Sequence, residues 1–146
     1  MQQNDMLNQV LVVTGRSLLQ YSAESWPWTG SGSSTLRSAI EALIAEQGLR
    51  VGRLAELLDS RGWTIEFGVF PDFTDLHYLS LVYVLPHLIK NERSVVRQIE
   101  AALPQCAGDA EGTALLAEIL AGERATLAKL EELSRSQPAA PAQSAA

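Results

Sequence analysis

Hydrophobic side chains recur every three or four residues along four stretches of the chain, a spacing that places them on one face of an α-helix. The four stretches span residues 5–26, 34–61, 74–103 and 109–133. Pro27, Gly62, Pro104 and Gly108 lie at their borders, where such residues end helices. The pattern predicts an all-α domain over residues 1–133. The Ala- and Pro-containing tail, residues 134–146, is predicted to be disordered.

The third stretch contains Pro86, and proline inside a helix removes a backbone hydrogen bond and bends the axis. Two interpretations follow from the sequence. Residues 74–103 form one kinked helix, or they form two helices that are separated at Pro86.

The lengths of the connections predict how the helices are arranged. The first and second stretches are joined by a short link, as are the third and fourth, so each pair is expected to form an antiparallel hairpin. The link from Gly62 to Phe73 has about twelve residues and can span ~40 Å when extended. A helix of about 25 residues has nearly the same length. This predicts a four-helix bundle with one long crossover between helices 2 and 3. The apolar residues of the crossover are expected to pack in a groove; they are Trp63, Ile65, Phe67, Phe70 and Phe73.

Five polar residues interrupt the apolar faces of these helices: Thr14, Glu46, Glu92, Glu123 and Thr126. At 1.5 Å per residue, these positions lie ~17–21 Å along their helices from the hairpin ends. Such similar heights predict a polar layer in the middle of the bundle. Three buried carboxylates need a metal ion, shared protons or an arginine, because burial and mutual repulsion raise their pKa values. Arg50 and Arg53, one and two turns beyond Glu46, are the candidate ion-pair partners. The alternative is that some of the glutamates lie at the edge of the bundle and reach water.

The composition narrows the class of protein. Hydrophobic residues make up 47% of the 146 residues, which is typical of one globular domain. The net charge of −6 argues against nucleic-acid binding. No apolar run approaches the ~18–20 residues of a membrane span, so no membrane association is expected. Cys106 is the one cysteine, which is typical of a reducing compartment, and no signal peptide is expected, so the sequence predicts a cytoplasmic protein.

The four helices carry sequence motifs that resemble the ferritin-like superfamily, most closely the bacterioferritin and rubrerythrin type of di-iron bundle. In that family the successive helices carry Glu, E-x-x-H, Glu and E-x-x-H. The matching stretches are LNQVLVVTGRSLLQY, IAEQGLRVGRLAELLDSRG, LIKNERSVVRQIEAAL and ILAGERATLAKLEEL. Within them Glu46, Glu92 and Glu123 match family glutamates. The resemblance covers residues 5–133 and implies a ferritin-like topology.

The chain departs from the family at the metal ligands. Thr14 occupies the first glutamate position, and Leu49 and Thr126 occupy the two histidine positions. Gln47 stands where bacterioferritins have a haem-ligating Met, so haem is not implied. Three of six ligands remain, and Leu49 cannot bind a metal. These departures argue against iron oxidation or oxygen activation by the family's route.

Other candidate chemistry is sparse. His77 and His87 are ten residues apart on one helix, too far to bind one ion together. Cys106 has no neighbouring histidine, and there is no phosphate-binding loop, nucleophile elbow or zinc-binding spacing.

Three functions remain open. The first is a non-catalytic ferritin-like protein without a cofactor, structural or interacting with a protein partner, that forms a homodimer through outward apolar residues. Those residues are Val10, Val12, Val13, Ile40, Ile44 and Val51. The second is a protein that binds one Mn, Mg or Ca ion through Glu46, Glu92 and Glu123. The third is a protein that holds a small apolar ligand between its helices.

Overall fold

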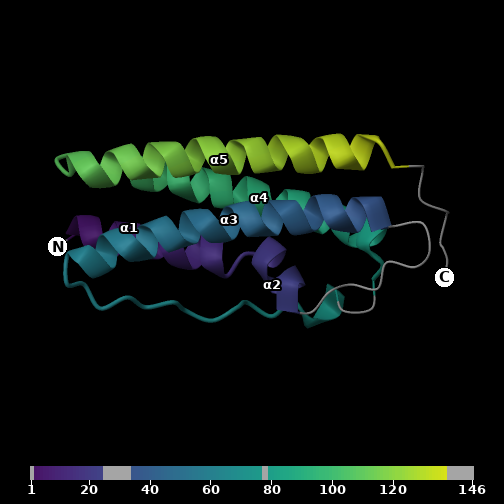
Figure 1. Ribbon diagram of the computed structural model, residues 1–146, viewed down its shortest axis with the longest axis horizontal. Coiled ribbons are helices and arrows are strands. Elements are labelled where there is room, and N and C mark those ends of the chain that lie inside the picture. The colour runs from purple at the N-terminus through teal and green to yellow at the C-terminus, as the bar shows by residue number, and fades with distance from the viewer. Residues whose placement is uncertain (1, 25–33, 77–78, 138–146) are drawn as a thin grey trace.

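The computed structural model describes residues 2–24, 34–76 and 79–137, and all regular structure in these ranges is helical (Figure 1). The α-helices are α1 (Gln2–Gly15), α2 (Leu18–Glu24), α3 (Ser34–Ser60), α4 (Leu81–Ala102) and α5 (Ala110–Arg135). Two short 3₁₀ helices, η1 (Thr74–Leu76) and η2 (Leu103–Cys106), precede α4 and follow it. The prediction of an all-α protein is confirmed. Within the described part of the chain, no helix is both long and apolar enough to cross a membrane.

The first predicted helix is divided into α1 and α2. α1 ends at Gly15, and Ser17 begins the next helix, since its Oγ accepts a hydrogen bond from the backbone N–H of Gln20. The N–H of Leu18, which has no partner in its own helix, donates to Oδ1 of Asn91 on α4 at 3.0 Å. One continuous helix over residues 5–26 is therefore wrong. Residues 25 and 26 lie outside the described ranges.

The third predicted helix begins later than expected but is not broken. Asp72 accepts hydrogen bonds from the backbone and hydroxyl of Thr74, and η1 follows this turn. α4 begins only at Leu81 and continues through Pro86 to Ala102. The interpretation with two helices separated at Pro86 is wrong. Buried residues on both sides of the proline hold α4 in place, among them Leu85 and Leu88.

The second and fourth predicted helices agree with α3 and α5 to within a few residues. α5 includes Ser134 and Arg135, which were predicted to belong to the tail. Residues 138–146 of the predicted tail lie outside the described ranges.

The long helices lie side by side along one axis. α1 contacts α3 and α4, and α5 contacts α3 and α4. In Figure 1, α1 and α5 run from left to right, whereas α3 and α4 both run from right to left. The chain returns between α3 and α4 along the outside of the molecule, and this extended segment comprises residues 63–73.

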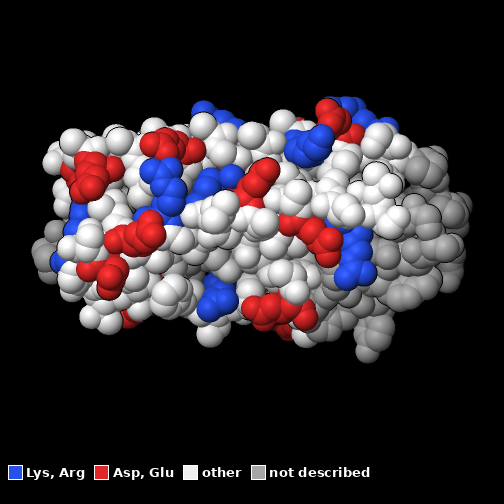
Figure 2. All heavy atoms as spheres, viewed as in Figure 1, with Lys and Arg blue, Asp and Glu red and all other residues white. Residues whose placement is uncertain are grey.

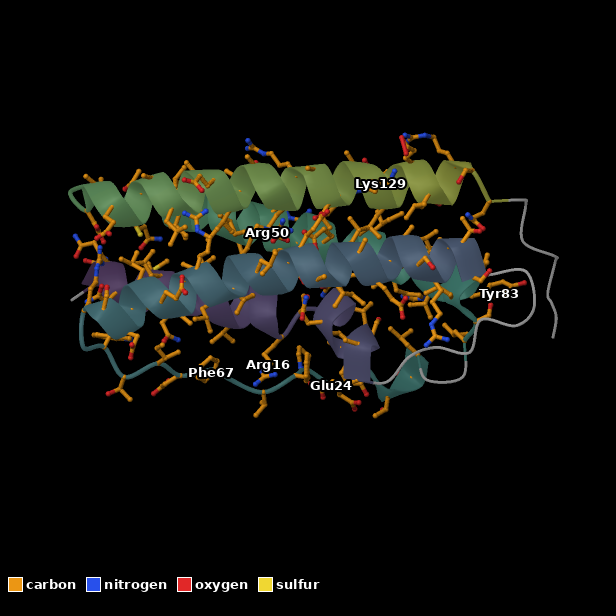
Figure 3. All side chains as sticks on the ribbon, viewed as in Figure 1. Arg16, Glu24, Arg50, Phe67, Tyr83 and Lys129 are labelled. Atoms are coloured by element: carbon orange, nitrogen blue, oxygen red, sulfur yellow. The ribbon has the colours of Figure 1, made fainter. Side chains whose placement is uncertain are left out.

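The extended segment is bound to α1 by side chains. The amide of Asn8 donates to the carbonyl of Glu66 and accepts from its N–H, as a neighbouring β-strand would. Arg16 donates to the carbonyls of Phe67 and Gly68. Trp63, Ile65 and Phe73 are partly buried against the core, and Phe70 packs edge-on against Tyr21. Phe67 lines a pocket with Leu11, Gly15 and Val51 but is 52% exposed, so it is covered less than predicted; Figure 3 shows it on the outer side of the molecule.

The apolar core is divided into two clusters. One lies between the start of α1 and the end of α3 and includes Leu7, Leu58 and Ile99. The other includes Ile40 and Leu85, near the opposite end of the long axis. Most of the described buried polar residues lie between these clusters along the long axis: Thr14, Ser17, Gln47, Glu92, Glu123 and Thr126. Asn8 lies beside the first cluster and Ser22 beside the second. Val10 and Ile40, predicted to face outward, are buried in the core, because Val10 lies on the same face as Leu7 and Ile40 on the same face as Leu36.

Candidate functional site

The most unusual feature of the interior is a set of hydrogen-bonded polar side chains between the two apolar clusters. We call this set the polar layer; it consists of Ser17, Gln47, Arg50, Glu92, Glu123 and Thr126. Gln47 and Glu123 are fully buried, and Glu92 is 1% exposed. The three residues come from α3, α4 and α5, so the polar layer connects the helices across the centre of the molecule.

The inner face of α3 differs from the sequence prediction by one residue. Gln47 and Arg50 point inward, while Glu46 is exposed and Leu49 is 73% exposed. The predicted inward positions of Glu46 and Leu49 are therefore wrong. The buried residues of α3 explain why: Leu36, Ile40, Leu43, Gln47, Leu54 and Leu57 follow each other at the four-then-three spacing of one helix face.

Gln47 is the central member of the polar layer. Its Oε1 accepts from the hydroxyl of Ser17 at 2.8 Å and from Nε2 of Gln20 at 3.2 Å. Its Nε2 donates to Oε1 of Glu123 at 2.7 Å and to Oε1 of Glu92 at 3.3 Å. Both ends of the amide are satisfied, which a buried polar group requires.

Arg50 supplies the positive charge of the polar layer. Its Nε donates to Oε2 of Glu123 at 2.6 Å, and its Nη2 donates to the hydroxyl of Thr126 at 2.9 Å. The Arg50 side chain is 16% exposed and the Glu123 side chain is fully buried. Figure 3 shows Arg50 between α3 and α5. The predicted arginine partner is thus Arg50, and it pairs with Glu123.

Glu92 is the buried carboxyl group without its own cation. Burial, together with hydrogen bonding and charge repulsion from Glu123, raises the pKa of Glu92 to about 10, although Arg50 and Gln47 act in the opposite direction. No described donor reaches Oε2 of Glu92, which is a buried oxygen. The protonated form is therefore favoured at neutral pH, since an ionised Glu92 would place a second negative charge beside Glu123.

Other predicted site residues lie apart from this network. The hydroxyl of Thr14 is buried but donates to backbone carbonyls of its own helix, those of Val10 and Leu11. Arg53 is exposed and pairs with Glu118 at the surface between α3 and α5. Because Glu46 is exposed on the outer side of α3, it does not converge with Glu92 and Glu123. The three-carboxylate cation site is not formed.

The remaining candidate groups add no second site. His87 is exposed, and His77 lies outside the described residues. Cys106 is buried in an apolar cluster, and burial raises the pKa of its thiol. Among the described residues, no three His, Cys, Asp or Glu side chains are placed so that they could hold a metal ion.

The donor set of the polar layer does not fit a di-iron centre. Such a centre needs bridging carboxylates and terminal imidazoles. Here the described interior offers two carboxyl groups, one of them protonated, and both already accept hydrogen bonds from Gln47. The guanidinium of Arg50 is bonded to Glu123, and a cation in that place would be repelled.

Searches against family models, curated proteins and solved structures found no match to this chain.

Proposed function

We propose that the chain is a ferritin-like four-helix bundle without di-iron chemistry, and that it acts as a structural or interaction protein in the form of a homodimer. The arrangement that supports the bundle type is the shared direction of α3 and α4, joined by the extended segment along the outside. An ordinary up-down-up-down bundle has antiparallel neighbours and short loops instead.

The bond between Arg50 and Glu123 is the observation that carries the non-catalytic part of this proposal. An internal guanidinium gives Glu123 the positive partner that a metal ion gives to carboxylates in a di-iron bundle. Gln47 and Thr126 bond to the same two side chains, Gln47 to Glu123 and Thr126 to Arg50, and complete the network. The polar layer then specifies how α3, α4 and α5 pack against one another.

Partial replacement of the metal ligands also supports this interpretation. On the inner face of α3, Gln47 and Arg50 have the spacing of the two ligands in E-x-x-H, one residue later than the resemblance matches them, and Thr126 stands three residues after Glu123 on α5. An amide, a guanidinium and a hydroxyl are hydrogen-bonding groups that build a closed network more readily than a metal centre.

Metal loading tests the proposal that the bundle has no di-iron chemistry. Purified protein is incubated anaerobically with Fe(II) or Mn(II), desalted, and measured by elemental analysis; oxygen uptake is then followed with Fe(II). We expect no retained metal and no uptake above the buffer rate, in the wild type and in Glu46→Gln. Retention of one or two ions that Glu123→Gln abolishes and Glu46→Gln preserves would overturn the proposal. Glu46→Gln is a matched control because it removes an exposed carboxylate from the same molecule.

A further inference from the structure

The outer face of α3 carries the most exposed large hydrophobic side chain of any described helix. Leu49 is 73% exposed, on the side of α3 opposite to Leu54 and the rest of the core. The residues above and below it on this face are also exposed, at the three-then-four spacing of a single helix stripe: Ala42, Ala45, Leu49, Gly52 and Glu56. A leucine on a uniformly exposed face of a 27-residue helix remains in contact with water unless another surface covers it.

The space beside Leu49 is open. A Cβ atom added at Gly48 or at Gly52 would meet nothing within 4 Å. The helix therefore presents a protruding leucine next to positions that have no side chain. Because neither glycine has a side chain, these two positions do not shield Leu49 from an approaching molecule.

The charges on either side of Leu49 are opposite. Glu46 is three residues before it and Arg53 is four residues after it, so the three share one side of the helix. In an antiparallel pair of α3 helices centred on Leu49, Glu46 of each copy lies over Arg53 of the other. Figure 2 shows acidic and basic side chains interspersed over the face that α3 and α5 present to the viewer, with no large patch of one sign.

Arg53 is able to take part in such a contact. Its present partner is Glu118, and both side chains are more than half exposed. Exposed ion pairs of this kind constrain their side chains little. Arg53 can therefore keep its contact with Glu118 of its own copy and at the same time contact Glu46 of a second copy.

We infer that the outer face of α3, centred on Leu49, is the surface on which a second copy of this chain docks in antiparallel orientation. This inference deepens the homodimer part of the proposed function and rests on it. A foreign helix could cover Leu49, but the exchange of Glu46 and Arg53 across a two-fold axis favours the same chain as partner.

Sedimentation velocity at 2–200 μM on the full chain tests the inference. Leu49→Glu places a charge at the centre of the contact, and we expect its dimer dissociation constant to rise about tenfold or more. Val69→Glu is the matched control: Val69 is 85% exposed on the extended segment, and its variant should dimerise as the wild type does. Far-UV circular dichroism and thermal unfolding verify that both variants are folded.

A charge exchange makes the test specific for orientation. In a Glu118→Gln background, which removes the neighbouring acid, Glu46→Arg and Arg53→Glu should each weaken the dimer, and the double variant should restore it. Restoration requires that residues 46 and 53 of different copies face each other.

The outcomes separate this inference from the proposed function. A wild type that stays monomeric at every concentration overturns the docking surface and the homodimer, while the metal experiment still decides the non-catalytic part. A dimer that tolerates Leu49→Glu and the single charge changes overturns the docking surface alone.

Discussion

The side chain of Arg50 crosses α5 at Gly122, the residue before its ion-pair partner Glu123. A Cβ atom built on Gly122 would lie 2.7 Å from Cδ and 2.9 Å from Nη1 of Arg50. Glycine at this position is therefore what allows the guanidinium to reach Oε2 of Glu123 and the hydroxyl of Thr126. The far end of Arg50 is fixed by these bonds, so it cannot move aside without breaking them.

The first prediction is that Gly122→Ala destabilises the protein although alanine is the better helix former. In an open helix position this change stabilises by about 1 kcal/mol. At Gly122 the added methyl group displaces Arg50 and leaves Glu123 without its cation. Urea unfolding should show a lower free energy of unfolding for Gly122→Ala. Gly48→Ala, where the methyl group meets open space, should be neutral or stabilising. Equal stabilisation by both changes would contradict this role of Gly122.

The second prediction concerns the Arg50–Glu123 pair. Arg50→Met leaves the buried Glu123 carboxylate without its counter-charge, which costs about 3–5 kcal/mol of unfolding free energy. Adding Glu123→Gln to Arg50→Met should recover part of that loss, because a neutral amide replaces the isolated charge. The four variants of this cycle are compared by urea unfolding at pH 7.

The exposed pair of Arg124 on α5 and Glu100 on α4 provides the control for this cycle, because it lies away from the outer face of α3. The same substitutions, Arg124→Met and Glu100→Gln, should leave stability unchanged, because water screens both groups. A strictly additive effect of Arg50→Met and Glu123→Gln would show that the two residues do not interact.

The third prediction follows from the raised pKa of Glu92. In the unfolded chain this group titrates near its ordinary value of 4.5, and in the folded protein near about 10. Between these values the folded state holds a proton that the unfolded state lacks, so stability falls as pH rises, by at most about 1.4 kcal/mol per pH unit. Glu92→Gln resembles the protonated carboxyl group and removes this dependence.

Unfolding free energies at pH 5.5, 7.0 and 8.5 measure the effect. The difference between Glu92→Gln and the wild type should increase steadily with pH. Glu100→Gln, on an exposed residue of the same helix, should change nothing with pH. A pH-independent difference for Glu92→Gln would mean that Glu92 is ionised in the folded protein.

Much of the architecture could be predicted because it depends on repeated apolar residues. The spacing of leucines fixed α3 and α5 to within a few residues, and it placed Glu92 and Glu123 inside. The break at Ser17 was missed, yet the sequence contains its signal: Gly15 can end a helix, and Ser17 with Gln20 three residues later is typical of a helix start.

The error at Glu46 has a different cause. Charged and apolar residues alternate closely around it, and the likeness to an E-x-x-H motif favoured Glu46 over its neighbour. The unbroken four-then-three spacing from Leu36 to Leu57 passes through Gln47 and Arg50, so the correct face could be read from the sequence alone. The hydrogen bonds that Arg50 makes across Gly122 could not be predicted from the sequence, because they join residues of separate helices.

The last prediction concerns the end of the molecule where α3 meets α5. Asp109 begins α5 by accepting from the N–H of Gly112, and its carboxylate also accepts two bonds from Arg61 at 2.8 and 2.9 Å. The hydrogen bonds with Arg61 are the largest cause that holds the pKa of Asp109 below its ordinary value, and the bond from Gly112 acts in the same direction. Because the pKa of Asp109 is lower in the folded protein than in the unfolded chain, where it is 3.8, the ionised group stabilises the fold at pH values above 3.8. This stabilisation is lost as the pH falls through the pKa of the folded state.

Two substitutions separate the two roles of Asp109. Asparagine can still cap the helix but cannot pair with Arg61 as a charge, whereas alanine loses both functions and should cost about 1 kcal/mol more. Urea unfolding from pH 2 to 6 should show that wild type loses more stability than Asp109→Asn on acidification below pH 4. If the two proteins lose stability in parallel, the ion pair with Arg61 contributes nothing, and Asp109 acts only as the first residue of α5.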